Sequence, residues 1–214
     1  MDTKQRQLAD LFALAPVIPV VVIDDAALAV PMARALVAGG LSAIEITLRT
    51  PAALEAVRAI AQDVEGAVVG VGSVRVAADF HAAERAGARF AVSPGSTPAL
   101  VAAAQASALP WLPGAATASE AMALAEHGFS HLKFFPAEAV GGAAALKALG
   151  APLPALRFCA TGGIEPGNAG AYLALPNVPC VGSSWCTPAA LLAAGDWGQV
   201  EARARQCAAL RTPR

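Results

Sequence analysis

A short apolar stretch followed by an alanine-rich amphipathic segment recurs eight times along the 214 residues, and this repetition strongly constrains the possible folds. The apolar stretches are typical of strands, and in the segments between them alanine and leucine recur at helical spacing. Strands that alternate with helices predict a parallel sheet with helical crossovers. Eight evenly spaced units favour closure into an α/β fold of the (β/α)8 TIM-barrel type over an open, doubly wound sheet. The predicted strands are 17–23, 43–49, 67–72, 89–93, 110–115, 131–135, 156–160 and 178–182.

No Gly/Ser-rich or highly charged linker interrupts the repetition, so residues 1–214 are expected to form a single domain. The first dozen residues and residues 196–210 have a helical pattern but fall outside the eight units. We therefore predict an extra N-terminal helix and a further helix near the C-terminus.

The composition excludes several classes of protein. Hydrophobic residues make up 56% of the chain and charged residues 14%, with a net charge of −1. Such a chain is too apolar to be intrinsically disordered and lacks the dense basic surface that nucleic-acid binding requires. A bilayer span needs about 20 consecutive apolar residues, whereas the longest apolar stretch, 11–23, is interrupted by Pro16 and Pro19. No convincing signal-peptide cleavage site follows it, so we expect a cytoplasmic protein without a membrane partner.

The cysteines and histidines do not form a recognisable metal or disulfide pattern. No two cysteines make a CxxC pair, and His81, His127 and His131 do not lie at metal-ligand spacing with them. Reduced, mostly buried thiols are therefore expected instead of a zinc site or a disulfide framework. The four cysteines are Cys159, Cys180, Cys186 and Cys207.

Two of the predicted strands contain charged or polar residues, which are unusual in otherwise apolar strands. In 43–49, alternation places Glu45, Thr47 and Arg49 on the face opposite the isoleucines, and in 131–135 Lys133 lies opposite two apolar residues. Because the apolar faces should contact the helices, the polar set is predicted to point into the barrel. Function in such barrels gathers at the carboxyl ends of the strands.

A lysine and a glutamate inside one barrel suggest covalent chemistry. Lys133 is flanked by Phe134 and Phe135, and removal from water favours the neutral amine, which can attack a carbonyl and form a Schiff base. Glu45 could then supply the proton transfers. Arg49 suits bidentate binding of a substrate carboxylate. The alternatives are a structural Lys133–Glu45 ion pair and a salt bridge of Arg49 at the barrel rim.

Two glycine-containing segments follow the seventh and eighth predicted strands. These are TGGI at 161–164 and GSSW at 182–185. Barrels frequently bind phosphate with these two loops, since glycines let backbone N–H groups approach an anion and a hydroxyl such as that of Ser184 adds a donor. A single Gly-Gly pair would more often mark only a tight turn. Neither GxGxxG nor GxxxxGK[ST] occurs, which argues against dinucleotide and P-loop sites.

The remaining polar and aromatic residues have simpler interpretations. His81 and His127 fall in predicted helices and are expected to face solvent, whereas His131 is expected to be a core histidine. Trp111 and Trp185 are expected to pack. The loops 69–74, 93–98 and 112–117 are either ordinary turns or the lining of a pocket at the carboxyl end of the barrel.

The chain resembles the 2-keto-3-deoxy-6-phosphogluconate (KDPG) aldolase and 4-hydroxy-2-oxoglutarate (KHG) aldolase family, whose members are class I aldolases. TLRT after Glu45, VGVGSV, SPG, LPGAAT, KFFPAE, RFCATGGI and GSSW occur in the family's order, from about Val17 to Trp197. The resemblance implies a homotrimeric (β/α)8 barrel that requires no metal or cofactor. Its expected substrate is a small phosphorylated 2-keto acid, cleaved to pyruvate and glyceraldehyde 3-phosphate.

The resemblance also implies roles for individual residues. Lys133 would be the Schiff-base lysine and Glu45 the general acid/base, while Arg49 and Ser73 would bind the pyruvyl carboxylate. Ser73 replaces the family's usual threonine, and PGAAT and the serines at 183–184 are further departures that affect substrate selection. The residues implied to line the pocket are Pro94, Phe135 and Thr161, and those implied to bind phosphate are Gly162, Gly163 and Ser184.

Three other functions stay open on the sequence. The galactonate-derived substrate would require the same lysine chemistry with inverted configuration at C4. Cleavage of 4-hydroxy-2-oxoglutarate would not use the phosphate loops. A non-catalytic phosphosugar-binding barrel would retain Lys133 and Glu45 only as an ion pair.

Overall fold

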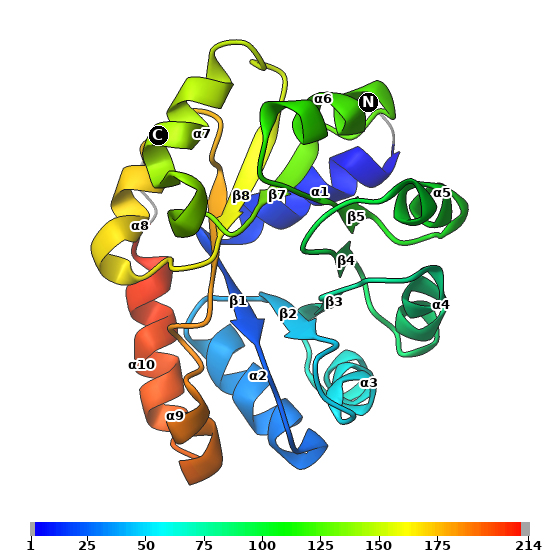
Figure 1. The fold of residues 1–214 in the computed structure, drawn as a ribbon. Coiled ribbons are helices and arrows are strands. Elements are labelled where there is room, and N and C mark those ends of the chain that lie inside the picture. The colour runs from blue at the N-terminus through cyan, green and yellow to red at the C-terminus, as the bar shows by residue number, and fades with distance from the viewer. Residues whose placement is uncertain (1–2, 211–214) are drawn as a thin grey trace.

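The computed structural model describes residues 3–210 and contains a parallel barrel surrounded by helices (Figure 1). Its strands follow the order β5-β4-β3-β2-β1-β9-β8-β7-β6, and every paired neighbour is parallel. The strands are β1 Val17–Val21, β2 Ala43–Thr47, β3 Val68–Gly72, β4 Ala91–Val92, β5 Trp111–Leu112, β6 Gly114–Ala115, β7 His131–Phe134, β8 Arg157–Thr161 and β9 Cys180–Ser183. The predicted TIM-barrel class is confirmed, and each of the eight predicted stretches overlaps a strand, although β8 and β9 each extend one residue beyond the predicted end.

The fifth predicted stretch closes the barrel. It is divided at Pro113 into β5, which pairs with β4, and β6, which pairs with β7. Proline has no N–H to donate to a strand ladder, so a break at this position is expected. Its carbonyl oxygen still accepts a hydrogen bond from the Lys133 N–H at 2.8 Å. One short segment therefore links the two edges of the sheet.

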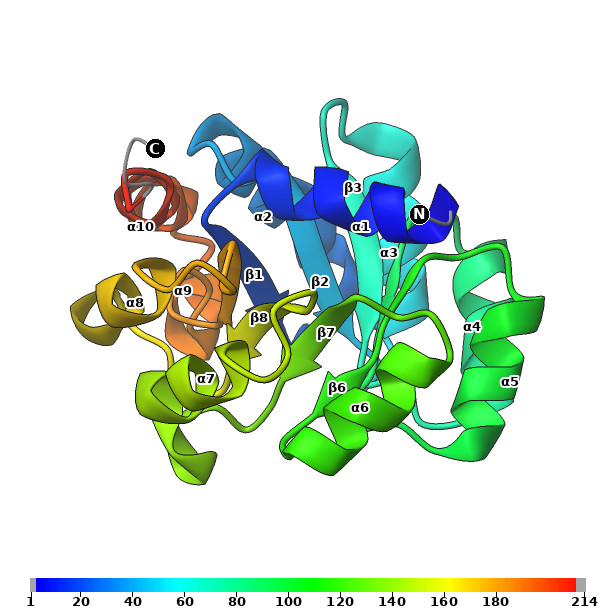
Figure 2. The same ribbon diagram turned by 90° about the horizontal axis from the view of Figure 1, so that it is seen from above.

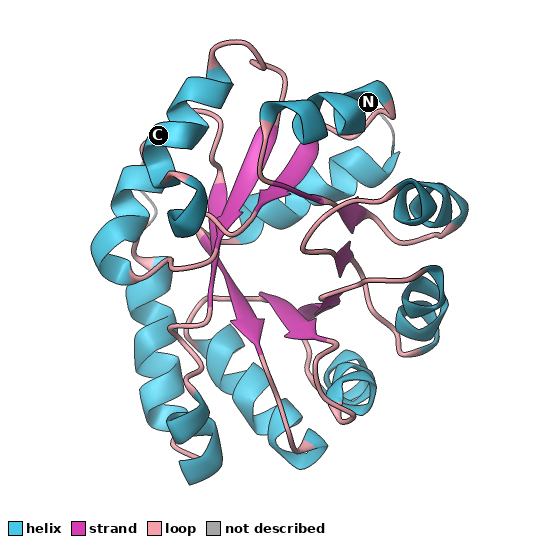
Figure 3. Cartoon of the chain, in the orientation of Figure 1, coloured by secondary structure: helices cyan, strands magenta, loops and turns pink. Residues whose placement is uncertain are grey.

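Helices cover the outside of the strands, as Figure 3 shows. The α-helices are α1 Thr3–Leu14, α2 Ala29–Ala38, α3 Ala53–Asp63, α4 Ala77–Arg85, α5 Pro98–Ala106, α6 Ala118–Glu126, α7 Gly142–Gly150, α8 Pro166–Leu173, α9 Ala189–Ala194 and α10 Trp197–Ala208. Two 3₁₀ turns, η1 Ala26–Leu28 and η2 Glu138–Val140, precede α2 and α7. The predicted extra helices at both ends are confirmed as α1 and α10.

Apolar side chains form two separate clusters, one on each side of the strands. The outer cluster includes Ile44 and Ile46 and lies between the strands and the helices, as the alternation in β2 predicts. The inner cluster includes Ile18 and Cys159, and α1 contributes Leu8, Leu11 and Phe12 to it. Figure 2 shows α1 lying across the strands. This helix fills the amino end of the barrel interior and leaves the carboxyl ends for polar residues.

Several interpretations of single residues are confirmed. His131 is buried, with Nδ1 3.3 Å from Gln5 Oε1, and burial lowers its pKa. His81 and His127 are exposed, and Trp111 lies in the outer core cluster. All four cysteines are free and buried.

Within residues 3–210 there is no group of three or more His, Cys, Asp or Glu side chains placed to hold a metal ion. None of the helices in this part of the chain is long and apolar enough to cross a membrane.

Candidate active site

Lys133 and Glu45 meet inside the barrel although they are 88 positions apart in the chain. Lys133 Nζ donates hydrogen bonds to Glu45 Oε1 at 3.1 Å and to Oε2 at 3.4 Å. The two side chains are only 7% and 4% exposed. The other ion pairs within residues 3–210 lie on the surface, so Lys133–Glu45 is the only ion pair in this part of the chain with both side chains buried. The predicted inward orientation of both residues is confirmed.

Gly72, the last residue of β3, makes room for the Glu45 carboxylate. A Cβ atom at position 72 would lie 2.0 Å from Glu45 Oε1, which is far inside van der Waals contact. β3 pairs with β2 throughout its length, so its glycine is held beside the strand that carries Glu45. The role of Gly72 was not predicted from the sequence, in which the available signal was the Gly-Val-Gly pattern at the end of an otherwise apolar strand.

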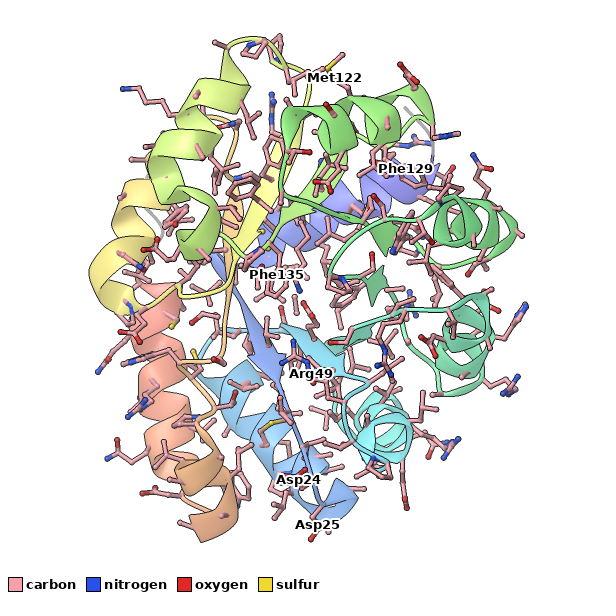
Figure 4. All side chains as sticks on the ribbon, viewed as in Figure 1. Asp24, Asp25, Arg49, Met122, Phe129 and Phe135 are labelled. Carbon is pink, nitrogen blue, oxygen red and sulfur yellow. The ribbon has the colours of Figure 1, made fainter. Side chains whose placement is uncertain are left out.

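The mouth of the barrel holds one aromatic and one cationic side chain near Lys133 and Glu45. Lys133 Nζ lies 5.5 Å from the centroid of the Phe135 ring, which places that ring against the amine. Figure 4 shows Phe135 and Arg49 near the middle of the ring of strands, whereas Asp24 and Asp25 lie at its periphery. Phe135 therefore lies beside Lys133, and its role in lining the pocket stays a prediction.

Arg49 is not part of a strand, which corrects the prediction that strand 43–49 extends to it. β2 ends at Thr47, where the chain turns and the Arg49 N–H donates to the Thr47 carbonyl oxygen at 2.8 Å. β2 ends here because its partner β3 ends at Gly72, opposite Thr47. The Leu48 N–H still donates to the Gly72 carbonyl oxygen, but no paired strand continues beyond this point. Arg49 is exposed at the mouth, and it forms no salt bridge within residues 3–210. The alternative of a rim salt bridge is therefore wrong for the described structure.

Ser73 holds the Arg49 side chain. Arg49 Nε donates a hydrogen bond to Ser73 Oγ at 3.0 Å. Ser73 has φ of 59°, and within residues 3–210 it is the only non-glycine residue with positive φ. Such backbone strain is concentrated at functional sites. The contact leaves the guanidinium NH₂ groups of Arg49 without a protein partner among the described residues, so they are available for a carboxylate.

The two glycine-containing loops lie side by side because β8 pairs with β9, with Thr161 opposite Gly182. Thr161 is buried at the end of β8, and a Cβ atom at Gly182 would lie 2.4 Å from Thr161 Oγ1. Gly162 and Gly163 have φ of 103° and 76°, values that favour glycine. Backbone conformations of this kind can direct successive N–H groups toward an anion.

The serines at 183 and 184 have different environments. Ser183 is buried, and its hydroxyl donates to the Ile164 carbonyl oxygen at 2.6 Å, which ties the loop after β9 to the loop after β8. Ser184 is exposed, and its hydroxyl has no hydrogen-bond partner within residues 3–210. Pro94 is also exposed, in the loop after β4. Ser184 therefore has the free hydroxyl that a phosphate site would use, whereas Ser183 has a structural role that the sequence analysis missed.

Comparison with known proteins agrees with this arrangement. Residues 8–203 match the family model of the KDPG and KHG aldolases. The 2-dehydro-3-deoxy-phosphogluconate aldolase of Pseudoalteromonas atlantica is 48% identical over 94% of this chain and 93% of its own length.

Solved structures give the same result. A KDPG aldolase of Legionella pneumophila, with pyruvate captured at low pH as a covalent carbinolamine intermediate, is similar with a TM-score of 0.90 and 43% identity, over 92% of this chain and 96% of that one. A KDPG aldolase of Zymomonas mobilis with 3-phosphoglycerate has a TM-score of 0.91 and 45% identity, over 97% of each chain. Because the similarity covers nearly all of both chains, the resemblance is confirmed and the chain belongs to the KDPG and KHG aldolase family.

Proposed function

We propose that the protein is a class I aldolase, a carbon–carbon lyase that cleaves KDPG to pyruvate and glyceraldehyde 3-phosphate through a Schiff base on Lys133. The observation that carries this proposal is the buried Lys133–Glu45 pair, which faces the mouth of the barrel beside Arg49 and Phe135. Membership of the aldolase family supports it. The carbinolamine captured in the Legionella relative supports the same lysine chemistry.

The geometry suits Schiff-base formation. Glu45 Oε1 lies 3.1 Å from Lys133 Nζ and accepts a proton from it, which leaves a neutral amine. The amine attacks the C2 ketone of the substrate to form a carbinolamine. The protonated Glu45 then gives its proton to the carbinolamine hydroxyl, which leaves as water, so that an iminium and the Glu45 carboxylate result. The iminium draws electrons from the bond to be broken, so the proposed reaction requires no metal ion or organic cofactor.

Cleavage then follows from the same two residues. Glu45, acting through a water molecule, removes the proton of the C4 hydroxyl, and the C3–C4 bond breaks as its electrons move to the iminium. Glyceraldehyde 3-phosphate leaves, and the remaining enamine takes up a proton at C3. Hydrolysis of the iminium releases pyruvate and regenerates the Lys133 amine.

The surrounding residues would hold the two ends of the substrate. Arg49, oriented by Ser73, would bind the pyruvyl carboxylate. Phe135, Pro94 and Thr161 would line the space between the ends. The phosphate would lie against the backbone N–H groups of Gly162 and Gly163 and the hydroxyl of Ser184. As the family resemblance implies, the working enzyme would be a cytoplasmic homotrimer.

A second substrate, 4-hydroxy-2-oxoglutarate, is favoured by a specific observation. The Lys133–Glu45 contact and the Arg49–Ser73 contact do not involve the loops after β8 and β9. A substrate without phosphate can therefore still react with Lys133, although it would lack the proposed contact between its phosphate and Ser184.

Comparing the two substrates tests the proposed function. The purified protein should release pyruvate from both, measured by coupled lactate dehydrogenase assay. Ser184→Ala should raise KM for KDPG about tenfold, since one hydrogen bond to a charged group is lost, and should change KM for 4-hydroxy-2-oxoglutarate little. Equal effects on both substrates would exclude the phosphate role, and the absence of pyruvate release with either would refute the aldolase proposal.

Gly72→Ala should lower kcat by about 100-fold, because the added methyl group displaces the Glu45 carboxylate from Lys133 and misplacement of a catalytic group by about 1 Å has an effect of this size. The measurement is kcat at saturating substrate, with circular dichroism to establish folding.

Gly170→Ala is the matched control, because Gly170 lies on α8 and a Cβ atom there has no heavy atom within 4 Å, so kcat should be unchanged. Combining Gly72→Ala with Glu45→Asp, which shortens the acid, should recover part of the activity relative to Gly72→Ala alone. A folded Gly72→Ala variant with wild-type kcat would contradict the assigned contact.

A further inference from the structure

A cavity lies on the outside of the barrel, away from the carboxyl ends of the strands. It has a volume of about 570 Å³ and lies between α3 and α4, beside the start of β3. These two helices are neighbours in space (Figure 1). The lining includes Val68, the first residue of β3, so the cavity is at the amino end of this strand. The proposed active site lies at the opposite, carboxyl end.

Three arginines line this cavity, one from each of its walls. Arg58 belongs to α3, Arg85 to the last turn of α4, and Arg89 to the segment before β4. The Arg89 N–H donates to the Val69 carbonyl oxygen at 2.8 Å, which fixes the backbone of that segment against β3. At Gly87, a Cβ atom would lie 3.2 Å from Ala61 Cβ, so α3 and the turn after α4 meet closely. The arginines are therefore carried by backbone of defined position.

None of the three guanidinium groups has a hydrogen-bond or ion-pair partner within residues 3–210. The acid next in sequence, Glu84, points elsewhere. Its Oε1 accepts hydrogen bonds from Ser107 Oγ at 2.5 Å and from the Ala108 N–H at 2.9 Å, which lower its pKa. Three uncompensated positive charges around one cavity create a local positive potential in a chain whose net charge is −1.

We propose that this cavity binds an anion containing a pyrophosphate group, such as a nucleoside diphosphate. Guanidinium groups bind phosphate oxygens through pairs of parallel N–H bonds, and three of them match the charge of a diphosphate better than that of a single phosphate. Gln62 adds a polar side chain, and Val68 and Ala86 provide apolar lining for an attached group. The volume falls in the range typical of small-molecule sites. The site does not depend on the proposed aldolase activity.

Isothermal titration calorimetry with inorganic pyrophosphate at low ionic strength tests the proposal. Wild-type protein should bind one pyrophosphate per chain at this cavity. Arg89→Ala and Arg85→Ala should each raise Kd about tenfold, and the double variant should abolish binding. ADP should bind with the same dependence on the arginines, whereas adenosine should not bind. Binding by inorganic pyrophosphate but not by ADP would limit the ligand to free pyrophosphate and would overturn the nucleotide assignment.

Arg6→Ala is the matched control, since Arg6 is an exposed arginine on α1 away from the cavity. Its Kd should be unchanged, and weakening equal to that of Arg89→Ala would mean that only general surface charge is involved. Ser184→Ala separates the cavity from the proposed phosphate loops. If pyrophosphate binding is lost in Ser184→Ala and retained in Arg89→Ala, the cavity does not bind it. A change of oligomeric state in Arg89→Ala, measured by light scattering, would identify the cavity as an interface between copies and overturn the proposal.

Discussion

Replacing Lys133 by methionine should abolish covalent trapping of pyruvate and lower turnover of KDPG by about 10⁴-fold or more, because the proposed nucleophile is removed. With pyruvate and borohydride, mass spectrometry of the wild-type protein should show one reduced pyruvate per chain. Lys133→Met should show none. The chain has three lysines, of which Lys4 is half-buried and Lys147 exposed.

Lys147→Met is the matched control for this experiment and should trap pyruvate as the wild-type protein does. An adduct at wild-type yield in Lys133→Met would assign the Schiff base to another amine. A folded wild-type protein that traps no pyruvate would favour the alternative of a non-catalytic barrel, in which Lys133 and Glu45 form only a structural ion pair.

The same substitution should also destabilise the protein, because it leaves the Glu45 carboxylate buried without its partner. Removing one member of a buried ion pair lowers the free energy of unfolding by about 3–5 kcal/mol. The double variant Lys133→Met/Glu45→Gln should recover part of this loss in urea unfolding, since no unpaired charge remains in the barrel. A double variant that regains stability but stays inactive would show that the loss of catalysis is not caused by unfolding.

Glu45→Gln should lower kcat by about 10²- to 10⁴-fold, the range for loss of a general acid/base. Glutamine retains the size of glutamate and can still contact Lys133 Nζ, but it cannot accept a proton from the amine or from the C4 hydroxyl. Trapping of pyruvate should therefore persist at a reduced rate while cleavage nearly stops. Comparing the rate of adduct formation with kcat measures the two roles separately.

Glu126→Gln provides the control for this variant, because Glu126 is an exposed glutamate at the end of α6. It should retain wild-type kcat. Near-normal turnover in Glu45→Gln would remove Glu45 from the mechanism, whatever its distance from Lys133.

The period of two in β2 and β7 predicted correctly that Glu45 and Lys133 face the interior, because side-chain direction in a strand follows from sequence position alone. The same rule failed at Arg49. Alternation holds only while a strand continues, and β2 ends at Thr47 where its partner β3 ends. The fifth predicted strand was similarly present but divided at Pro113, because its two halves pair with different neighbours.

Close approaches between strands could not be predicted in the same way. Gly72 leaves space for the Glu45 carboxylate only because of the register of β3 against β2. The contrast between Ser183 and Ser184 depends on Ser183 reaching Ile164 across the two loops. The three arginines of the outer cavity belong to separate elements, so their assembly around one cavity has no local sequence signal.

By itself, the sequence determined the alternation of strands and helices, the barrel class, the inward direction of Lys133 and Glu45, and the family. These properties depend on periodicity, local propensity and motif order, which can be read from the order of residues in the chain. Only the tertiary structure decided the 3.1 Å contact between Lys133 and Glu45, the hydrogen bond from Arg49 to Ser73, and the arginine-lined cavity. Each of these depends on closure of the barrel and on strand register, which bring distant residues together through packing of the whole chain.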